Sequence, residues 1–237
     1  EALNFTEKEI QFVKPFYKNS DIYKWGYNHN NNSWIIITNR IENINDYPNI
    51  KGHLIKYKKI LDERYRNFAL IDADKEGKWW YLYGYRPDTN FDGVKIVFPY
   101  RSLKNTFAFS ENQFYSVMDI FYINLLDRQF SEKYILAIIN STLIYYWLQK
   151  NCKKKGKMFE LIQKPLSLIP TKEANKEIQY KFVELVDKII SITKSEDYFK
   201  NQPKQNKVKE YEKQIDKLVY HLYNITPEEI AIVELGN

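Results

Sequence analysis

The chain has 237 residues, 44% of them hydrophobic, with a net charge of +6 and an isoelectric point of about 9.0. This length can bury one large core or two small ones. The mean hydropathy is −0.58, and no apolar run approaches the ~18–20 residues of a membrane span, which argues against a membrane protein. The single cysteine cannot form an internal disulfide, and residues 1–14 are charged throughout, unlike a secretory signal. We therefore expect a cytoplasmic protein.

The positive charge is concentrated in two stretches. Residues 51–66 contain six lysines and arginines against two acids, and residues 150–157 contain five lysines and no acid. Such stretches can be solvated surfaces, or they can bind the phosphates of a nucleic acid, which gives salt-sensitive affinity but little sequence choice. The candidate phosphate contacts are Lys51, Lys58, Lys59, Lys153, Lys154, Lys155 and Lys157.

Patterning predicts two helices and a strand in the first third of the chain. Thr6, with Glu9 three residues later, forms a capping-box pattern and predicts a short helix that ends near residue 14. Residues 34–38, which are one aromatic, three isoleucines and a threonine, predict a strand. Residues 46–66 place apolar side chains at helical spacing and predict a helix with a basic outer face.

The middle of the chain is rich in residues that favour strands. Short strands are predicted at 78–85, 94–98, 106–109, 113–117 and 120–123, with turns between them. Residues 131–150 then predict a helix that can break at Asn140-Ser141. A basic loop at 153–157 is expected to follow this helix.

The last part of the chain predicts helices only. Two amphipathic helices are expected at 178–192 and 208–223, separated by a polar break at 202–207. Thr226, with Pro227 after it, starts a third, shorter helix. The whole pattern predicts an α+β fold: a mixed, mainly antiparallel β-sheet domain with flanking helices at 1–170, followed by a C-terminal helical hairpin at 171–237.

Patterns for catalysis and metal binding are mostly missing from the sequence. The three histidines are scattered and the glycines form no phosphate-binding loop, so we expect no metal and no catalytic residue in this chain. Phe98-Pro99-Tyr100 lacks the polar side chain that amino-methyltransferases use on a flipped base. One segment imitates the acid–lysine arrangement of metal-dependent nucleases, although a solvated turn is the simpler interpretation. Its residues are Asp72, Asp74, Glu76 and Lys78.

Seven groups of residues follow one another in a characteristic order. They are Lys14-Pro15-Phe16; Tyr47-Pro48 with His53-Leu54; Trp79-Trp80 with Lys95-Ile96-Val97-Phe98-Pro99; Phe114-Tyr115-Ser116; Leu136-Ala137-Ile138-Ile139-Asn140-Ser141; Lys157 and Phe159 with Ile169-Pro170; and Leu222-Tyr223 with Ile225-Thr226. Together they resemble the TaqI-like C-terminal specificity domain of type IIG restriction–modification enzymes and N6-adenine DNA methyltransferases. The family often has a second proline before Pro170 and a second glycine near Gly156. This chain lacks both, so its loops at these two places are expected to differ from those of the family.

The resemblance implies a sequence reader for double-stranded DNA within a larger enzyme. An upstream methyltransferase domain in the same parent chain would flip an adenine and methylate its N6 with S-adenosylmethionine, and Mg²⁺ would serve a parent that also cuts DNA. This chain itself would need no cofactor and would offer side chains from loops to the base edges. The candidate base readers, all near strand ends, are Arg86, Asn90, Arg101, Lys104 and Asn105.

Three other interpretations remain open from the sequence. A fragment of a type I specificity subunit would share the Asn-Ser helix and the closing proline. A metal-dependent nuclease would use the acid–lysine segment named above. An RNA-binding or purely structural domain would also fit the basic charge and the aromatic content, although no aromatic-basic run typical of RNA-binding motifs is present.

Overall fold

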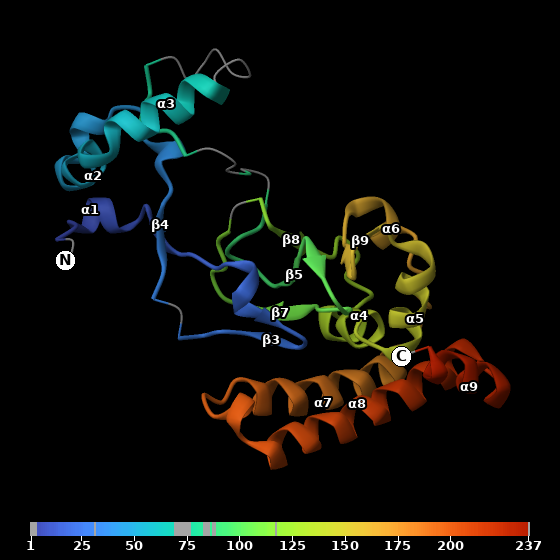
Figure 1. Cartoon of the computed structure of the whole chain (residues 1–237). Coiled ribbons are helices and arrows are strands. Elements are labelled where there is room, and N and C mark those ends of the chain that lie inside the picture. The colour runs from blue at the N-terminus through green and yellow to red at the C-terminus, as the bar shows by residue number, and fades with distance from the viewer. Residues whose placement is uncertain are drawn as a thin grey trace. The chain divides into compact units, whose positions relative to one another are not determined.

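The computed structural model describes residues 4–30, 32–68, 77–82, 86, 89–116 and 118–236, of which 64–68 by their backbone alone. The chain divides into two compact units (Figure 1). The first comprises Glu1–Phe16 and Asn32–Thr89, and the second comprises Tyr17–Asn31 and Asn90–Asn237. Within the described ranges, no helix is both long enough and apolar enough to cross a bilayer.

The first unit combines one pair of strands with three helices. Strand β1 (Val13–Pro15) pairs antiparallel with β4 (Trp34–Ile36). The helices are α1 (Glu7–Ile10), α2 (Pro48–Leu54) and α3 (Lys58–Phe68), and a 3-10 turn at Ile55–Tyr57 joins the last two. The buried apolar residues of this unit are Phe12, Ile41, Ile44 and Ile50.

Glu9 joins the first two helices of this unit. Its carboxylate is buried and closes the capping box of α1 by accepting the backbone N–H of Thr6 at 3.0 Å. It also accepts the backbone N–H groups of Asn49 and Ile50 at 2.8 and 3.2 Å, two donors that the first turn of α2 leaves without helical partners. Burial raises the pKa of Glu9, but these hydrogen bonds outweigh burial and bring the pKa to about 2.

Replacing Glu9 by glutamine should lower the free energy of unfolding at neutral pH by on the order of 2 kcal/mol, because two helix N-termini lose their negative partner. In the wild type the pKa of the folded state lies below the ordinary 4.5, so the contribution of Glu9 is complete above that pH and is lost as the pH falls toward about 2. Urea unfolding followed by circular dichroism should show that the difference in free energy of unfolding between the two proteins becomes smaller as the pH falls. A gap of constant size would contradict this assignment.

The second unit contains a three-stranded antiparallel sheet with β5 (Lys95–Pro99) at its centre. β5 pairs with β7 (Ala108–Ser110) on one side and with β8 (Ile120–Ile123) on the other. Every residue of β5 is buried, which is the pattern of a strand covered on both faces. A short hairpin of β2 (Ile22–Tyr23) and β3 (Gly26–Tyr27) packs against β5 and β7.

Six helices complete the second unit. They are α4 (Glu132–Ile139), α5 (Thr142–Asn151), α6 (Gln163–Ser167), α7 (Lys176–Thr193), α8 (Gln202–Tyr223) and α9 (Pro227–Leu235). Helix α4 packs against β5 and β7 and also against α7, so it lies between the sheet and the C-terminal helices. Helices α7 and α8 run side by side as a hairpin, which Figure 1 shows in orange and red-orange.

Two carboxylates of α8 tie this helical hairpin to the rest of the unit. Asp216 accepts the N–H and the hydroxyl of Thr142, the first residue of α5, at 2.7 and 2.8 Å. Glu212 accepts the indole N–H of Trp25 at 2.7 Å and pairs with Lys24 at 2.8 Å. The C-terminal helices thus share one core with the sheet. The two compact units are not divided at 170/171. The predicted boundary between a recognition domain and a C-terminal helical segment therefore stays a prediction.

The predicted α+β class, with small antiparallel sheets, flanking helices and a C-terminal helical hairpin, is confirmed. Several details differ. Residues 113–116 of the strand predicted at 113–117 belong to none of the described strands, and residue 117 lies outside the described residues. The first helix ends at Ile10 because the chain beyond it joins β4 in a strand. Of the strand predicted at 78–85, residues 83–85 lie outside the described residues and 78–82 form no strand. The carbonyl and the indole N–H of Trp80 are instead bonded to Thr38 and Ile41. Pro203 does not interrupt α8 but lies in its first turn, where a proline needs no N–H partner.

Candidate nucleic-acid interface

Two basic segments that are far apart in the sequence lie in one three-stranded antiparallel sheet of the second unit. Its strand order is β6 (Arg101–Ser102), β10 (Met158–Glu160), β9 (Lys154–Lys155). Arg101 lies opposite Glu160, and Lys155 lies opposite Met158. The sheet therefore brings a predicted base reader beside the predicted phosphate contacts. We refer to these strands and the turn between β9 and β10 as the basic sheet.

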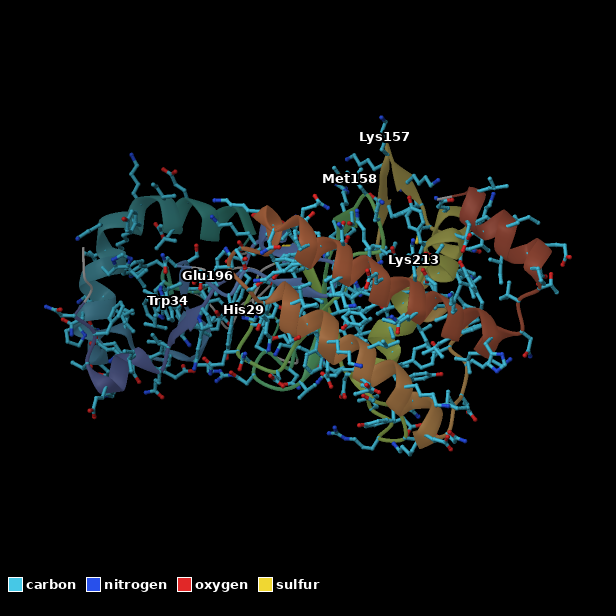
Figure 2. The ribbon with its side chains drawn as sticks, turned by 90° about the horizontal axis from the view of Figure 1, so that it is seen from below. His29, Trp34, Lys157, Met158, Glu196 and Lys213 are labelled. Atoms are coloured by element: carbon cyan, nitrogen blue, oxygen red, sulfur yellow. The ribbon has the colours of Figure 1, made fainter. Side chains whose placement is uncertain are left out.

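Strands β9 and β10 form a hairpin instead of the loop predicted at 153–157. Gly156, in the turn, has a φ of +61°, a left-handed conformation that glycine adopts at little cost. Lys154, Lys155 and Lys157 are exposed and have no carboxylate partner among the described residues. Lys157 and Met158 project from the tip of this hairpin into solvent (Figure 2). The hairpin thus presents three unneutralised ammonium groups.

Glu160 is the only carboxylate within the three strands, and it is buried. It accepts from the guanidinium of Arg101 at 3.1 Å and from the hydroxyl of Tyr100 at 3.3 Å, and the Nζ of Lys153 lies 3.7 Å away. Burial raises the pKa of Glu160, but the Arg101 hydrogen bond and the charge of Lys153 hold it below its usual value. The same hydrogen bond raises the pKa of Arg101. Glu160 is therefore an anion that fixes two of the candidate cations.

Arg101 is held on a second side by an aromatic ring. The centre of its guanidinium lies 4.8 Å from the centroid of Tyr100. With Glu160 hydrogen-bonded to it and the ring of Tyr100 nearby, the guanidinium is restricted to few orientations, which lowers the entropy that a further contact would cost. About a third of the Arg101 side chain is exposed, so it can contact a partner from this position.

The two residues predicted as readers after β6 have different environments. Lys104 is exposed and has no ion-pair partner in the part of the chain that the structure describes. Asn105 is buried, and its amide donates to the carbonyl oxygens of Ile139 and Ser141 at 3.0 and 2.9 Å. Both N–H groups of this amide are thus engaged at the break between α4 and α5, a position that does not favour base reading, and the predicted role of Asn105 stays a prediction.

Asn140 completes this connection from the other side. Its side-chain amide donates to the carbonyl of Phe107 at 2.9 Å, and its oxygen accepts the N–H of Phe107 at 3.2 Å. The next residue, Ser141, accepts the N–H of Ile144 and caps α5. Asn105 and Asn140 thus clamp the end of α4 to the chain between β6 and β7, and so set where the basic sheet leaves the core.

The remaining two predicted readers lie in different units. Asn90, in the second unit, is exposed, and its side-chain oxygen accepts the N–H of Gly93 at 2.8 Å. Lys95 secures the same turn by donating to the carbonyls of Gly93 and Asn112 at 2.5 and 2.8 Å. Burial lowers the pKa of Lys95 to about 8, against the attraction of Asp92. Arg86 belongs to the first unit and is half-buried.

Comparison with known protein families identifies the type of domain. The sequence profile described as the TaqI-like C-terminal specificity domain matches residues 47–171, more than half of the 237 residues. The chain belongs to this family. A search of curated proteins found no match. Membership confirms the resemblance and makes the chain a DNA-recognition module of restriction–modification enzymes, whose role is specificity and not catalysis.

The specificity-domain match covers the basic sheet and all twelve candidate contact residues. It ends one residue beyond the predicted boundary at 170/171. The match assigns the role of the domain, and the individual DNA contacts of Arg101, Lys104 and the hairpin lysines stay predictions.

Three further candidate contacts of this specificity domain lie in the first unit, on α2 and α3. Lys51 donates to the side chain of Asn45 at 2.7 Å, which holds its ammonium at the surface of α2. The Nζ of Lys58 lies 5.4 Å from the ring centroid of Trp79, and Lys59 is exposed. These lysines present positive charge on one helical segment, as the sequence pattern predicts.

The nuclease interpretation finds no support in the described residues. Asp72, Asp74 and Glu76 lie outside them, while Lys78 forms an ion pair with Glu42 at 2.8 Å. Among the residues described, no three His, Cys, Asp or Glu side chains come together as a metal site would need. The predicted absence of a metal site is not tested further by this observation.

Sequence reasoning missed Glu160 and Tyr100, which orient Arg101. A carboxylate in a lysine-rich neighbourhood is a signal for such a role, but its partner lies 59 residues away in the sequence. It also missed the exposed side chains of Leu103 and Met158, because no strand was predicted at either position.

Proposed function

We propose that this chain is the sequence-specific recognition module for double-stranded DNA of a larger N6-adenine DNA methyltransferase or fused restriction–modification enzyme. The observation that supports this most directly is the basic sheet, which places Arg101 beside the hairpin lysines within a domain of the specificity family. In this proposal the catalytic domain lies upstream in the parent chain. S-adenosylmethionine, and Mg²⁺ if the parent also cuts DNA, belong to that missing part.

In this proposal some residues of the basic sheet supply affinity for DNA, and others supply the choice of sequence. Lys154, Lys155 and Lys157, exposed and without carboxylate partners among the described residues, neutralise phosphates and set the register of the duplex. Arg101 reads a base edge, because a guanidinium fork can donate two parallel hydrogen bonds to guanine in the major groove. Tyr100 and Glu160 hold that fork in place before DNA arrives.

Replacing Arg101 by alanine should relax the choice of one base in the recognition sequence, by a factor of about 5 to 150, which corresponds to the loss of one bidentate base contact. The parent enzyme tests this when it is expressed in cells whose DNA is then sequenced for N6-methyladenine. The wild type should mark one motif, and Arg101→Ala should mark that motif together with variants that differ at one fixed position.

Two control variants sharpen this test. Arg101→Lys keeps the charge but not the fork, so it should relax the same position. Arg128→Ala removes an exposed arginine outside the basic sheet and should leave the motif intact. Unchanged base choice in Arg101→Ala would remove Arg101 from the readers, and a parent that marks no adenine in any motif would contradict the proposed function itself.

A further inference from the structure

Two large apolar side chains are exposed at the edge of the basic sheet. Leu103 is 57% exposed and Met158 is 43% exposed. Leu103 directly follows β6, in which Ser102 lies opposite Phe159, so the next position of that register faces Met158. Met158 in turn lies opposite Lys155 on β9. The two apolar residues thus occupy neighbouring positions of the sheet, one residue beyond the β6–β10 pairs.

Neighbouring residues of β10 differ sharply in how much of their side chains is exposed. Phe159, the residue after Met158, is only 2% exposed and belongs to the core, and Glu160 beyond it is buried beside Arg101 and Tyr100. Met158 is therefore the one exposed residue of β10. Met158 lies on the opposite face of β10 from Phe159, and Leu103 takes the position opposite Met158 in the register. Figure 2 shows Met158 beside Lys157 at the hairpin tip, away from the body of the unit.

Cations border the apolar pair on both strands. Lys104 follows Leu103, and Lys155 and Lys157 lie beside Met158; all three are exposed and have no carboxylate partner among the described residues. An apolar pair bordered by unneutralised lysines is complementary to a duplex, in which phosphates flank an apolar stack of bases. A partner protein would instead have to supply three acidic groups around an apolar socket.

We propose that Leu103 and Met158 form an apolar wedge that enters the duplex at a base step while Lys104, Lys155 and Lys157 hold the flanking phosphates. This inference rests on the proposed function and adds to it a deformation of the DNA. Leucine and methionine are among the side chains that DNA-bending proteins insert between bases, where apolar contact replaces lost stacking. Pyrimidine–purine steps unstack at the lowest cost, so the wedge selects them without any hydrogen bond to a base.

The test uses the whole 237-residue chain and a 30-base-pair duplex of alternating thymine and adenine, with 2-aminopurine in place of alternate adenines. The fluorescence of 2-aminopurine rises when the base loses its stacking, and the anisotropy of a terminal dye reports binding separately. Wild-type chain at saturation and low salt should raise the 2-aminopurine signal at least about twofold. Leu103→Ser and Met158→Ser should each remove most of this rise while the slope of affinity against salt stays unchanged, because no cation is lost.

The matched control is Met118→Ser, which removes a methionine that is 57% exposed but lies outside the basic sheet, and it should behave as the wild type. These surface substitutions leave the fold intact, which circular dichroism checks. Binding by anisotropy without a rise in 2-aminopurine signal would overturn the wedge and leave the proposed function in place. A rise that survives both serine variants would overturn it as well. The absence of any binding at low salt would overturn the proposed function, and the wedge with it.

Discussion

Replacing Lys154, Lys155 and Lys157 together by alanine should lower the affinity of the chain for duplex DNA by on the order of 10²–10³-fold at ~0.1 M salt. The slope of log affinity against log salt should fall by about 2.7, since each neutralised phosphate contributes about 0.9. The physical reason is the exposure of three ammonium groups on one hairpin with no carboxylate partner in the described part of the chain. The loss should be the same for every duplex sequence, because phosphate contacts carry no sequence information.

A second triple variant separates this effect from a general loss of charge. Lys209, Lys213 and Lys217 are exposed on α8, and replacing them removes the same three charges from another element, where Figure 2 places Lys213. Fluorescence anisotropy titrations at several salt concentrations should show a small decrease for the α8 variant and the full decrease for the hairpin variant. Equal slopes for the two variants would show that the hairpin has no special role and that only net charge attracts DNA.

Replacing Asn140 by alanine should lower the free energy of unfolding by about 2 kcal/mol, because it leaves the buried N–H of Phe107 without a partner. It also removes one of the two donors to the carbonyl of Phe107, which still accepts the N–H of Trp25 at 2.9 Å. The effect on DNA binding should be indirect. Phe107 belongs to the segment that leads from β6 to β7, and a loosened segment no longer holds β6 in register with β10. Urea unfolding of the wild type and of Asn140→Ala measures the loss directly.

Asn105 provides the matched variant for this prediction. It donates to the carbonyls of Ile139 and Ser141 at the same junction, and the carbonyl of Ser141 also accepts the N–H of Tyr145. Asn105→Ala should therefore lower the free energy of unfolding by a similar amount, about 2 kcal/mol. If Asn105 read a base instead, its replacement would change sequence choice and leave stability unaltered. A stable Asn105→Ala protein with altered base choice would contradict the structural role assigned to it.

The parts of the fold that could be predicted are those that depend on local chemistry. Ser141 reads as a helix cap within an apolar run, and the chain does break there into α4 and α5. Thr226 with Pro227 marks the start of α9 in the same way. In each case the signal and the structure that it specifies lie within one turn of helix, so no tertiary information is needed.

The basic sheet could not be predicted, because its strands are two or three residues long and show no periodicity. The pairing of Arg101 with Glu160 joins segments 59 residues apart, and no local pattern in either segment specifies the other as its partner. Asn105 was expected at the surface because asparagine after a strand is typical of a turn. Its burial depends on the carbonyls of Ile139 and Ser141 at the break between α4 and α5, which come together only in the folded chain.

The central claim is that this chain reads DNA sequence by itself, and selection from a randomised duplex pool tests it most directly. The wild-type chain is mixed with the pool at a low and a high salt concentration, and the retained duplexes are sequenced. If the chain reads sequence, one short motif that contains an adenine should be enriched at both salt concentrations. Retention without any enriched motif, lost as the salt concentration rises, would reduce the basic sheet to a general phosphate-binding surface and contradict the claim.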